Sequence, residues 1–302
     1  MDVARLRVLR ELADRGSVTA VASALSFTPS AISQQLKALS TEVGMPLTEP
    51  SGRGVRLTDA GRVLAAEAEA VLAALAKADA ALEQLRTVPR GQVRMAIFQS
   101  GARMLLGGVL TRLAALGGVE LLCRDIDLTP DDVPALAAEY DIVVSHRDEH
   151  APPPSTARWR VVPLLREPLD VVLPRSHPLA ASEQVAFADL TDEAWISVNV
   201  GFPVDDLLRS LAVQTGTTLR VVQRINDFSV TEELVACGHG IALLPRYSTD
   251  DRGGRRIVLR TLAGVRAARL VDVVMRTSAA ERPAVQAVLA ALQAEAAALT
   301  GW

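Results

Sequence analysis

The 302-residue sequence has little cysteine and no long hydrophobic run that is free of charge. Its two cysteines, Cys123 and Cys237, lie far apart and form no CxxC pair, which predicts buried thiols in a reducing compartment. Glu67, Glu69 and Glu295 interrupt the long apolar stretches that a membrane span would require. No signal peptide opens the sequence. We therefore expect a cytoplasmic protein without a membrane partner.

Motifs of the common enzyme chemistries are also missing. The sequence has no GxSxG nucleophile elbow, no GK[ST] phosphate loop and no GxGxxG after a predicted strand. These absences disfavour an enzyme, and no cofactor is expected. A net charge of −3 argues against a protein that coats nucleic acid indiscriminately, although it is compatible with a specific DNA reader whose basic groups are local.

What is present is the composition of an ordinary folded protein. Hydrophobic residues make up 49% of the chain and charged residues 22%. At this length we expect two or three domains, each with its own core.

The stretch from Thr28 to Leu39 predicts a helix that presents polar side chains. Thr28 can cap the helix, and Pro29 occupies the first helical position, where a missing N–H costs nothing. Apolar residues spaced by four and three form a buried stripe and leave a polar face of Ser30, Ser33, Gln34 and Lys37. Ser and Gln can hydrogen-bond base edges in a groove, and Lys can meet a phosphate. Taken alone, the pattern fits an ordinary amphipathic surface helix equally well.

Two further helices are predicted before this one, over residues 2–14 and from a Ser17 or Thr19 cap to Leu25. A tight turn at Phe27 then leads into the presenting helix, which is the order of a helix-turn-helix. Downstream, the segment SGRGVRLT predicts a hairpin with Arg53 at its tip. Such a hairpin can act as a wing that reaches a minor groove or a phosphate.

From Thr58 to Arg86 the pattern predicts one long helix. Apolar residues step by four and three along it and form a seam: Leu64, Ala68, Val71, Leu75, Ala78, Leu82 and Leu85. We expect this seam to join two copies of the chain, so that two presenting helices address two half-sites on DNA. The alternative is that the same seam packs on the later part of its own chain.

After a break at residues 88–91, short β-rich runs alternate with helical segments. This alternation predicts largely parallel, helix-covered sheets, most simply in two subdomains. The predicted strands are 93–98, 119–124, 140–145, 169–174, 195–198, 219–224, 241–245 and 270–275, and the helices lie near 103–115, 131–138, 204–215, 230–237 and 281–299. His146 and His150 are four apart, but we interpret them as loop residues and not as metal ligands.

Several blocks of this sequence, in order, resemble the LysR-type transcriptional regulators. TAVASALSFTPSAISQQLKAL, VGMPL and GRGVRLTDAG are similar to that family's helix-turn-helix, wing and start of the linker helix. The segments 166–180 and 233–245 are similar to two recurring segments of its effector domain. The chain departs from the family at Leu47-Thr48-Glu49-Pro50, where Leu-Phe-x-Arg is usual, and at Ser40, where Glu is usual.

The resemblance implies an α/β chain with an all-α N-terminal part. A winged helix-turn-helix would occupy residues 1–57, a linker and dimerisation helix 58–87, and an effector domain 88–302. That last domain would have two lobes like a periplasmic binding protein, lobe I about 91–163 with 268–302 and lobe II about 164–267. Two crossings between the lobes would then form a hinge around a ligand cleft.

The resemblance also implies the roles of particular residues. Ser30, Ser33 and Gln34 would read bases of double-stranded DNA, while Thr28, Pro29, Lys37 and Arg53 would hold its backbone or minor groove. The effector would meet Gln99, Ser100 and Gly101, where a hydroxyl and backbone N–H groups open a helix and can bind an anion. By analogy, Asn199, Phe228 and Ser229 would face the cleft from the other lobe. The alternative for Ser100 is a helix cap, and the two roles are compatible.

The sequence thus predicts a homodimeric or homotetrameric DNA-binding transcriptional regulator controlled by a small-molecule effector of unknown identity. A small carboxylate is the effector class that the resemblance loosely suggests, and RNA polymerase is a further partner that it allows. The competing hypothesis is a cytosolic solute-binding or enzymatic α/β protein whose N-terminal helices mediate protein contacts.

Overall fold

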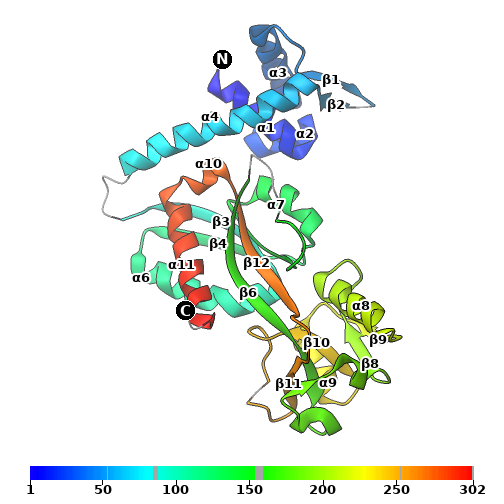
Figure 1. Cartoon of the computed structure of the whole chain (residues 1–302). Coiled ribbons are helices and arrows are strands. Elements are labelled where there is room, and N and C mark those ends of the chain that lie inside the picture. The colour runs from blue at the N-terminus through cyan, green and yellow to red at the C-terminus, as the bar shows by residue number, and fades with distance from the viewer. Residues whose placement is uncertain (53, 84–87, 154–158, 252, 301–302) are drawn as a thin grey trace.

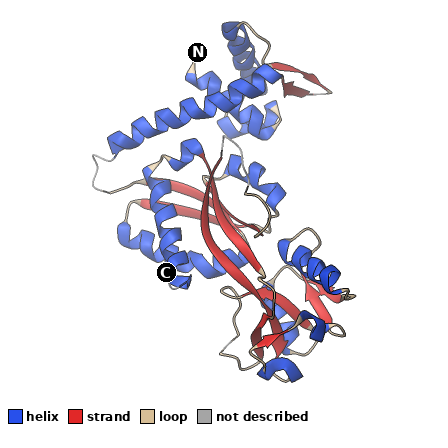
Figure 2. Cartoon of the chain, in the orientation of Figure 1, coloured by secondary structure: helices blue, strands red, loops and turns tan. Residues whose placement is uncertain are grey.

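The computed structural model describes residues 1–302 apart from 53, 84–87, 154–158, 252 and 301–302. An N-terminal helical part lies at one end, a long helix runs from it, and two α/β lobes follow (Figure 1). Strands continue through both lobes, whereas helices dominate the N-terminal part (Figure 2). Each of the three parts has its own cluster of buried apolar side chains in the described residues.

The N-terminal part packs helices α1 (Val3–Arg15), α2 (Val18–Leu25) and α3 (Pro29–Val43) around one core. Each helix starts where a side-chain oxygen accepts a backbone N–H, from Asp2, Ser17 and Thr28 respectively. Helix α3 is longer than predicted, because no helix breaker occurs before Gly44 adopts a left-handed conformation (φ 75°).

The wing consists of strands β1 (Thr48–Ser51) and β2 (Gly54–Leu57), which pair antiparallel. Arg53, the predicted tip residue, lies outside the described residues. Ser40 anchors the chain that enters the wing, since its Oγ accepts the Leu47 N–H at 3.3 Å. At the other departure from the family, over residues 47–50, Leu47 is buried. Glu49 pairs with Arg56 across the hairpin at 2.8 Å.

The long helix α4 (Asp59–Glu83) begins in close contact with the wing. A Cβ at Gly61 would lie 2.0 Å from the Leu47 carbonyl oxygen, so only glycine allows this approach. Part of the predicted apolar seam packs within its own chain, and part of it is exposed and free to join a second copy. Leu64 and Ala68 pack into the N-terminal core of their own chain, whereas Val71, Leu75 and Leu82 are exposed. Leu85 lies outside the described residues.

Lobe I contains strands β3 (Gly91–Ile97), β4 (Val119–Asp125) and β5 (Ile142–Asp148), which are parallel in the order β4-β3-β5. Side chains from its helices pack into the same core. These helices are the π-helical η1 (Ala102–Leu106), α6 (Gly107–Leu116), α7 (Val133–Glu139), α10 (Thr277–Ala280) and α11 (Pro283–Thr300). Two short segments of the same lobe, α5 (Gln99–Gly101) and η2 (Pro130–Asp132), lie outside this core cluster.

Lobe II contains strands β7 (Gln184–Val185), β8 (Ala194–Ser197), β9 (Arg220–Arg224), β10 (Ile241–Pro245) and β11 (Ile257–Leu262). Strands β10, β8 and β9 are neighbours and parallel. Helices α8 (Pro203–Thr215) and α9 (Phe228–Ala236) and the short turns η3 (Pro178–Ala181) and η4 (Phe187–Leu190) contribute to its core.

Two long strands, β6 (Trp159–Pro174) and β12 (Ala268–Arg276), connect the lobes. They pair antiparallel with each other, β12 is also antiparallel to β5, and β6 is antiparallel to β10 and β11. The prediction of largely parallel sheets is therefore wrong at the junction of the lobes. The first half of β6 escaped prediction because its prolines and charges interrupt the hydrophobic pattern, and β11 was also missed.

The expectation of buried thiols is wrong. Cys237 is exposed where α9 ends, and Cys123 on β4 is half-buried. Burial, together with the charge of Asp125, raises the pKa of the Cys123 thiol to about 11. In the described part of the chain, no helix is both long and apolar enough for a membrane crossing.

Candidate functional site

The polar face of α3 is exposed over its whole predicted extent, while Ile32, Leu36 and Leu39 are buried beneath it. These three side chains pack against α1, α2 and the start of α4, so the core holds α3 in a fixed orientation. The residues predicted to meet DNA in this helix, Ser30, Ser33, Gln34 and Lys37, therefore lie together on one open surface.

Within that surface, the hydroxyls already have local partners. Ser30 Oγ lies 3.0 Å from Thr28 Oγ1, and Ser33 Oγ donates to the Pro29 carbonyl at 3.0 Å. The Thr28 hydroxyl also accepts the Ala31 N–H at 3.2 Å as the helix cap. Gln34 and Lys37 extend furthest from the backbone, which makes them the side chains best able to reach a groove.

The second predicted site lies between the lobes, where Ser100 follows β3. Ser100 is not the helix cap that the alternative required, because the cap position is Phe98 and its side chain makes no capping hydrogen bond. Instead, Ser100 Oγ accepts a hydrogen bond from Arg269 Nη2 at 3.0 Å. Gly101 is buried, and a Cβ there would lie 2.7 Å from the Phe98 ring.

A buried ion pair forms the floor of this cleft. Arg269 on β12 donates through Nε and Nη2 to Glu167 Oε2 on β6 at 2.8 and 2.7 Å. The other Glu167 oxygen accepts the N–H groups of Tyr247 and Ser248, each at 3.0 Å. Both charged side chains are almost wholly inaccessible, so their mutual pairing is required to keep them in the interior.

Polar bridges hold the two lobes together at the rim of the cleft. Asn226 donates to Asp127 at 2.6 Å, and Gln99 donates to Asp227 at 3.4 Å. The cavity that remains is about 40 Å³, and its lining includes Phe98, Gln99, Ser100, Asp127, His146, Phe202, Asn226, Phe228 and Arg269. The lobes are thus closed on each other, with room for only a very small molecule.

Of the predicted effector residues, the structure brings Gln99, Ser100 and Phe228 to this cavity. Asn199 and Ser229 are exposed and do not line it. The Asn199 N–H donates to Asn226 Oδ1 at 2.8 Å, while Asp227 caps α9 and its carboxylate accepts the Ser229 N–H at 2.8 Å. Hydrogen bonds from Ser229 to the Asp227 carboxylate hold the pKa of that carboxyl below its ordinary value.

His146 is not the loop residue that we expected but part of strand β5, with a buried side chain beside the cavity. Its ring packs edge-on against Phe98 with centroids 4.6 Å apart, and its Nδ1 is buried without a partner in the structure as described. Burial, with the positive charge of Arg269, lowers the pKa of His146 to about 3. His150 is exposed and contacts Asp148.

Two family models together cover most of the chain. Residues 3–62 match a bacterial regulatory helix-turn-helix protein of the lysR family, and residues 86–297 match a LysR substrate binding domain.

The chain belongs to the LysR family of transcriptional regulators.

Curated relatives of this LysR-type regulator match it over most of their length. The RuBisCO operon transcriptional regulator of Allochromatium vinosum is 25% identical over 265 residues, 86% of this chain and 85% of that protein. The small neutral protease regulatory protein of Streptomyces lividans is 29% identical over 280 residues, 88% and 79% of the two chains. Proteins of this family are DNA-binding transcriptional regulators with an effector-binding domain, and that is the function of this chain.

Solved structures share the fold of this LysR-type regulator. Full-length OxyR from Pseudomonas aeruginosa superposes with a TM-score of 0.66 at 20% identity and covers 97% of this chain and 98% of its own. CbnR complexed with its target DNA gives a TM-score of 0.54 at 20% identity, with 98% and 100% covered. The Synechocystis regulatory domain CcmR, in complex with 2-PG, gives 0.59 at 21% identity over 68% of this chain and 97% of its own.

Sequence reasoning missed the residues that build the cleft of this LysR-type regulator from β12, β6 and the loop after β4. Glu167 lies in the family segment 166–180, but no motif marks Arg269 or Asp127, and Glu167 and Arg269 meet only through the antiparallel crossing of the lobes. Arg269 interrupts a hydrophobic run, and this pattern could have indicated a site. An arginine in a buried strand needs an acceptor or an opposite charge beside it.

The lowered pKa of His146 makes the stability of the protein pH-dependent. Below pH 6.5 the unfolded chain takes up a proton that the folded chain binds only near pH 3, so acidification favours unfolding. Between pH 7 and 5 we expect the parent to lose about 2 kcal/mol more unfolding free energy than a His146→Leu variant. Denaturant titrations at both pH values measure this, with exposed His239→Leu as the control. An equal loss in parent and His146→Leu would contradict the assignment.

Proposed function

We propose that this LysR-type regulator reads operator DNA with the α3 face and responds to a small effector bound in the cleft between its lobes. The observation that carries the DNA assignment is the exposed row of Ser30, Ser33, Gln34 and Lys37 on a helix whose opposite face is fully buried. We divide the chain as predicted, into a DNA-binding domain of residues 1–57, a linker helix of 58–87 and an effector domain of 88–302.

In this proposal the residues of α3 divide by reach and chemistry. Gln34, with Ser30 and Ser33, contacts base edges in the major groove, because amide and hydroxyl groups both donate and accept there. Lys37 and the cap residues Thr28 and Pro29 lie against the phosphate backbone, and Arg53 in the wing turn extends the contact. The relative CbnR has been crystallised with its target DNA, which supports the same use of the fold here.

We further propose a homodimer, or a homotetramer, built on helix α4. Val71, Leu75 and Leu82 are 41%, 44% and 68% exposed, and their spacing of four and seven places them on one face of the helix. Exposure of such a row of large apolar side chains to water is unfavourable, and burial against a second copy lowers the free energy. A dimer would present two α3 helices to two half-sites.

The protein that we propose is cytoplasmic and not an enzyme, and it needs no cofactor. Its relatives are regulators of transcription, which supports the first two points. The competing hypothesis is a solute-binding or enzymatic α/β protein whose N-terminal helices bind another protein. A gel shift with the DNA upstream of its own coding sequence separates the two, because only the regulator retards that fragment at low protein concentration.

Substitutions in α3 should separate backbone contacts from base contacts. Lys37→Ala should lower affinity for all DNA sequences and reduce the slope of log K against log salt by about one, since one phosphate contact is lost. Gln34→Ala should relax the preference at one base pair and leave the slope unchanged. Fluorescence anisotropy over a salt series measures both, with Lys77→Ala on α4 as the charge-matched control. An unaltered salt slope for Lys37→Ala would count against the assignment.

The effector assignment is tested at Ser100. Thermal-shift screening of small carboxylates and phosphorylated acids, with 2-PG among them, first identifies a compound that stabilises the native protein. Ser100→Ala should then weaken the stabilisation and the compound's effect on operator affinity by about tenfold in concentration, because a hydroxyl beside Arg269 is lost. Basal operator affinity should stay within error. An identical dose response in variant and parent would exclude Ser100 from the site.

A further inference from the structure

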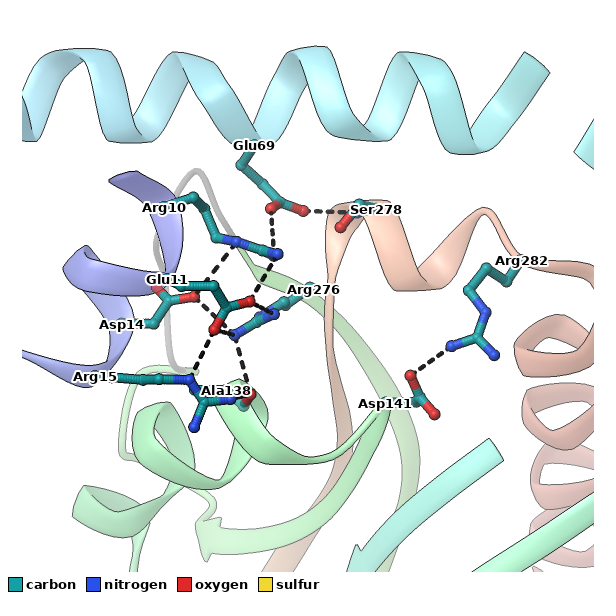
Figure 3. A network of polar contacts seen from close by, with 10 residues as sticks. All are labelled: Arg10, Glu11, Asp14, Arg15, Glu69, Ala138, Asp141, Arg276, Ser278 and Arg282. Carbon is teal, nitrogen blue, oxygen red and sulfur yellow. Dashed lines mark hydrogen bonds and ion pairs between the residues drawn. The ribbon is translucent and has the colours of Figure 1, made fainter. Parts of the chain in front are cut away.

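The DNA-binding domain is docked on lobe I of its own chain through a group of charged side chains. Figure 3 shows α1 and α4 facing the end of β12, the start of α10 and the end of α7. We call this group the interdomain cluster, and its six members are Arg10, Glu11, Asp14 and Arg15 of α1, Glu69 of α4 and Arg276 of β12.

Arg276 is the centre of the interdomain cluster. Its guanidinium lies 2.8 Å from Glu11 and 2.9 Å from Asp14, and it donates to the Ala138 carbonyl at 3.0 Å. Arg15 donates to the same carbonyl at 2.6 Å, so α1 and β12 share an acceptor at the end of α7.

Glu69 makes the second crossing between the domains. One of its oxygens accepts from Arg10 at 3.1 Å, and the other accepts the Ser278 N–H at the start of α10 at 2.7 Å. Helix α4 is therefore fastened to lobe I by a buried carboxylate, where the Glu69 side chain is only 2% exposed.

The interdomain cluster balances three guanidinium groups against three carboxylates. Burial alone would raise the pKa of the Glu11 carboxyl, but the charges of Arg276 and Arg10 hold it below its ordinary value. With so little solvent around it, the loss of Arg276 would leave three buried carboxylates facing two guanidinium groups, a larger penalty than the loss of a surface pair.

The two domains also meet beside the interdomain cluster, where α7 packs on α1. Short helix α10 packs on α4, but next to it a groove of about 620 Å³ separates the rest of α4 from lobe I. Leu72 and Leu75 line one side of this groove, and Tyr140 and Pro283 line the other. The interdomain cluster therefore supplies the charged part of this contact, alongside the packing of α10 on α4 and of α7 on α1.

Strand β12 runs from the interdomain cluster to the effector cleft. Arg276 is its last residue, and Arg269, which contacts Ser100 and Glu167, lies seven residues earlier, roughly 23 Å away in an extended strand. The strand pairs with β6 along its whole length and with β5 along most of it. Its register with β6 shifts between Val271 and Asp272, but the hydrogen-bonded ladder continues on both sides of that point.

We propose that the interdomain cluster fixes the DNA-binding domain to lobe I of the same chain, and that β12 transmits the state of the cleft to it. Effector contact at Ser100 displaces Arg269, and β12 shifts as a result. The shift changes the ion pairs that Arg276 makes with α1. The transmission half of this proposal rests on the proposed effector site, whereas the docking half does not.

The test is hydrogen exchange of the α1 amides in the full-length protein. Arg276→Gln should accelerate exchange in α1 at least about tenfold, because the buried pairs that hold α1 on lobe I are lost. Arg282→Gln is the matched control and should change it less than about twofold, because its partner Asp141 belongs to lobe I and the pair touches neither α1 nor α4. If Arg276→Gln does not fold by circular dichroism, Arg276→Lys keeps the charge but loses the fork and should give a smaller acceleration.

Transmission is tested by combining substitutions. Ser100→Ala should change α1 exchange in the parent and have no effect in the Arg276→Gln or Arg276→Lys background, because the link is already broken. Unchanged α1 exchange in both Arg276 variants would overturn the docking, and an equal Ser100→Ala effect in both backgrounds would overturn the transmission. These readouts need no DNA, so failure of the proposed DNA binding in gel shifts would be recognised separately.

Discussion

The antiparallel pairing of β6 with β12 is the constraint on which the rest of this regulator depends. These two strands carry the chain between the lobes, and they bring Glu167 and Arg269 together as a buried ion pair under the cleft. A pair of charges so far from water persists only while both strands stay in register. The cleft, the lobe cores and the attachment of the DNA-binding domain therefore all depend on the pairing of β6 with β12.

The N-terminal domain follows a simpler logic of local signals. Caps at Asp2, Ser17 and Thr28 start its helices, and an apolar stripe centred on Ile32 and Leu36 sets the orientation of α3. Its attachment to the effector domain includes a buried cluster of paired charges, in contrast to its apolar interior. Apolar packing thus orients α3 within its domain, and paired charges help to orient that domain relative to the lobes.

Much of the fold could be predicted because its signals are local. The cap at Thr28, the stripe under α3 and most strands follow from spacing alone, and the family blocks supplied the order of domains. Gln99 and Ser100 were within reach because they follow a predicted strand, whereas Phe228 was named only by analogy with the family, which also named Asn199 and Ser229 outside the cavity. Arg269, Glu167 and Arg276 were not, because Arg269 is 102 residues from Glu167 and Arg276 is 265 residues from Glu11, and no periodicity encodes such pairings.

The most direct test of this account is the stability of the β6–β12 ladder itself. Native-state hydrogen exchange in increasing denaturant reports which amides open together. The amides of β12 from Arg269 to Arg276 should exchange in one cooperative step, at the free energy of the most stable unit of the protein. Two steps, with the Arg269 end opening with lobe II and the Arg276 end with lobe I, would contradict it.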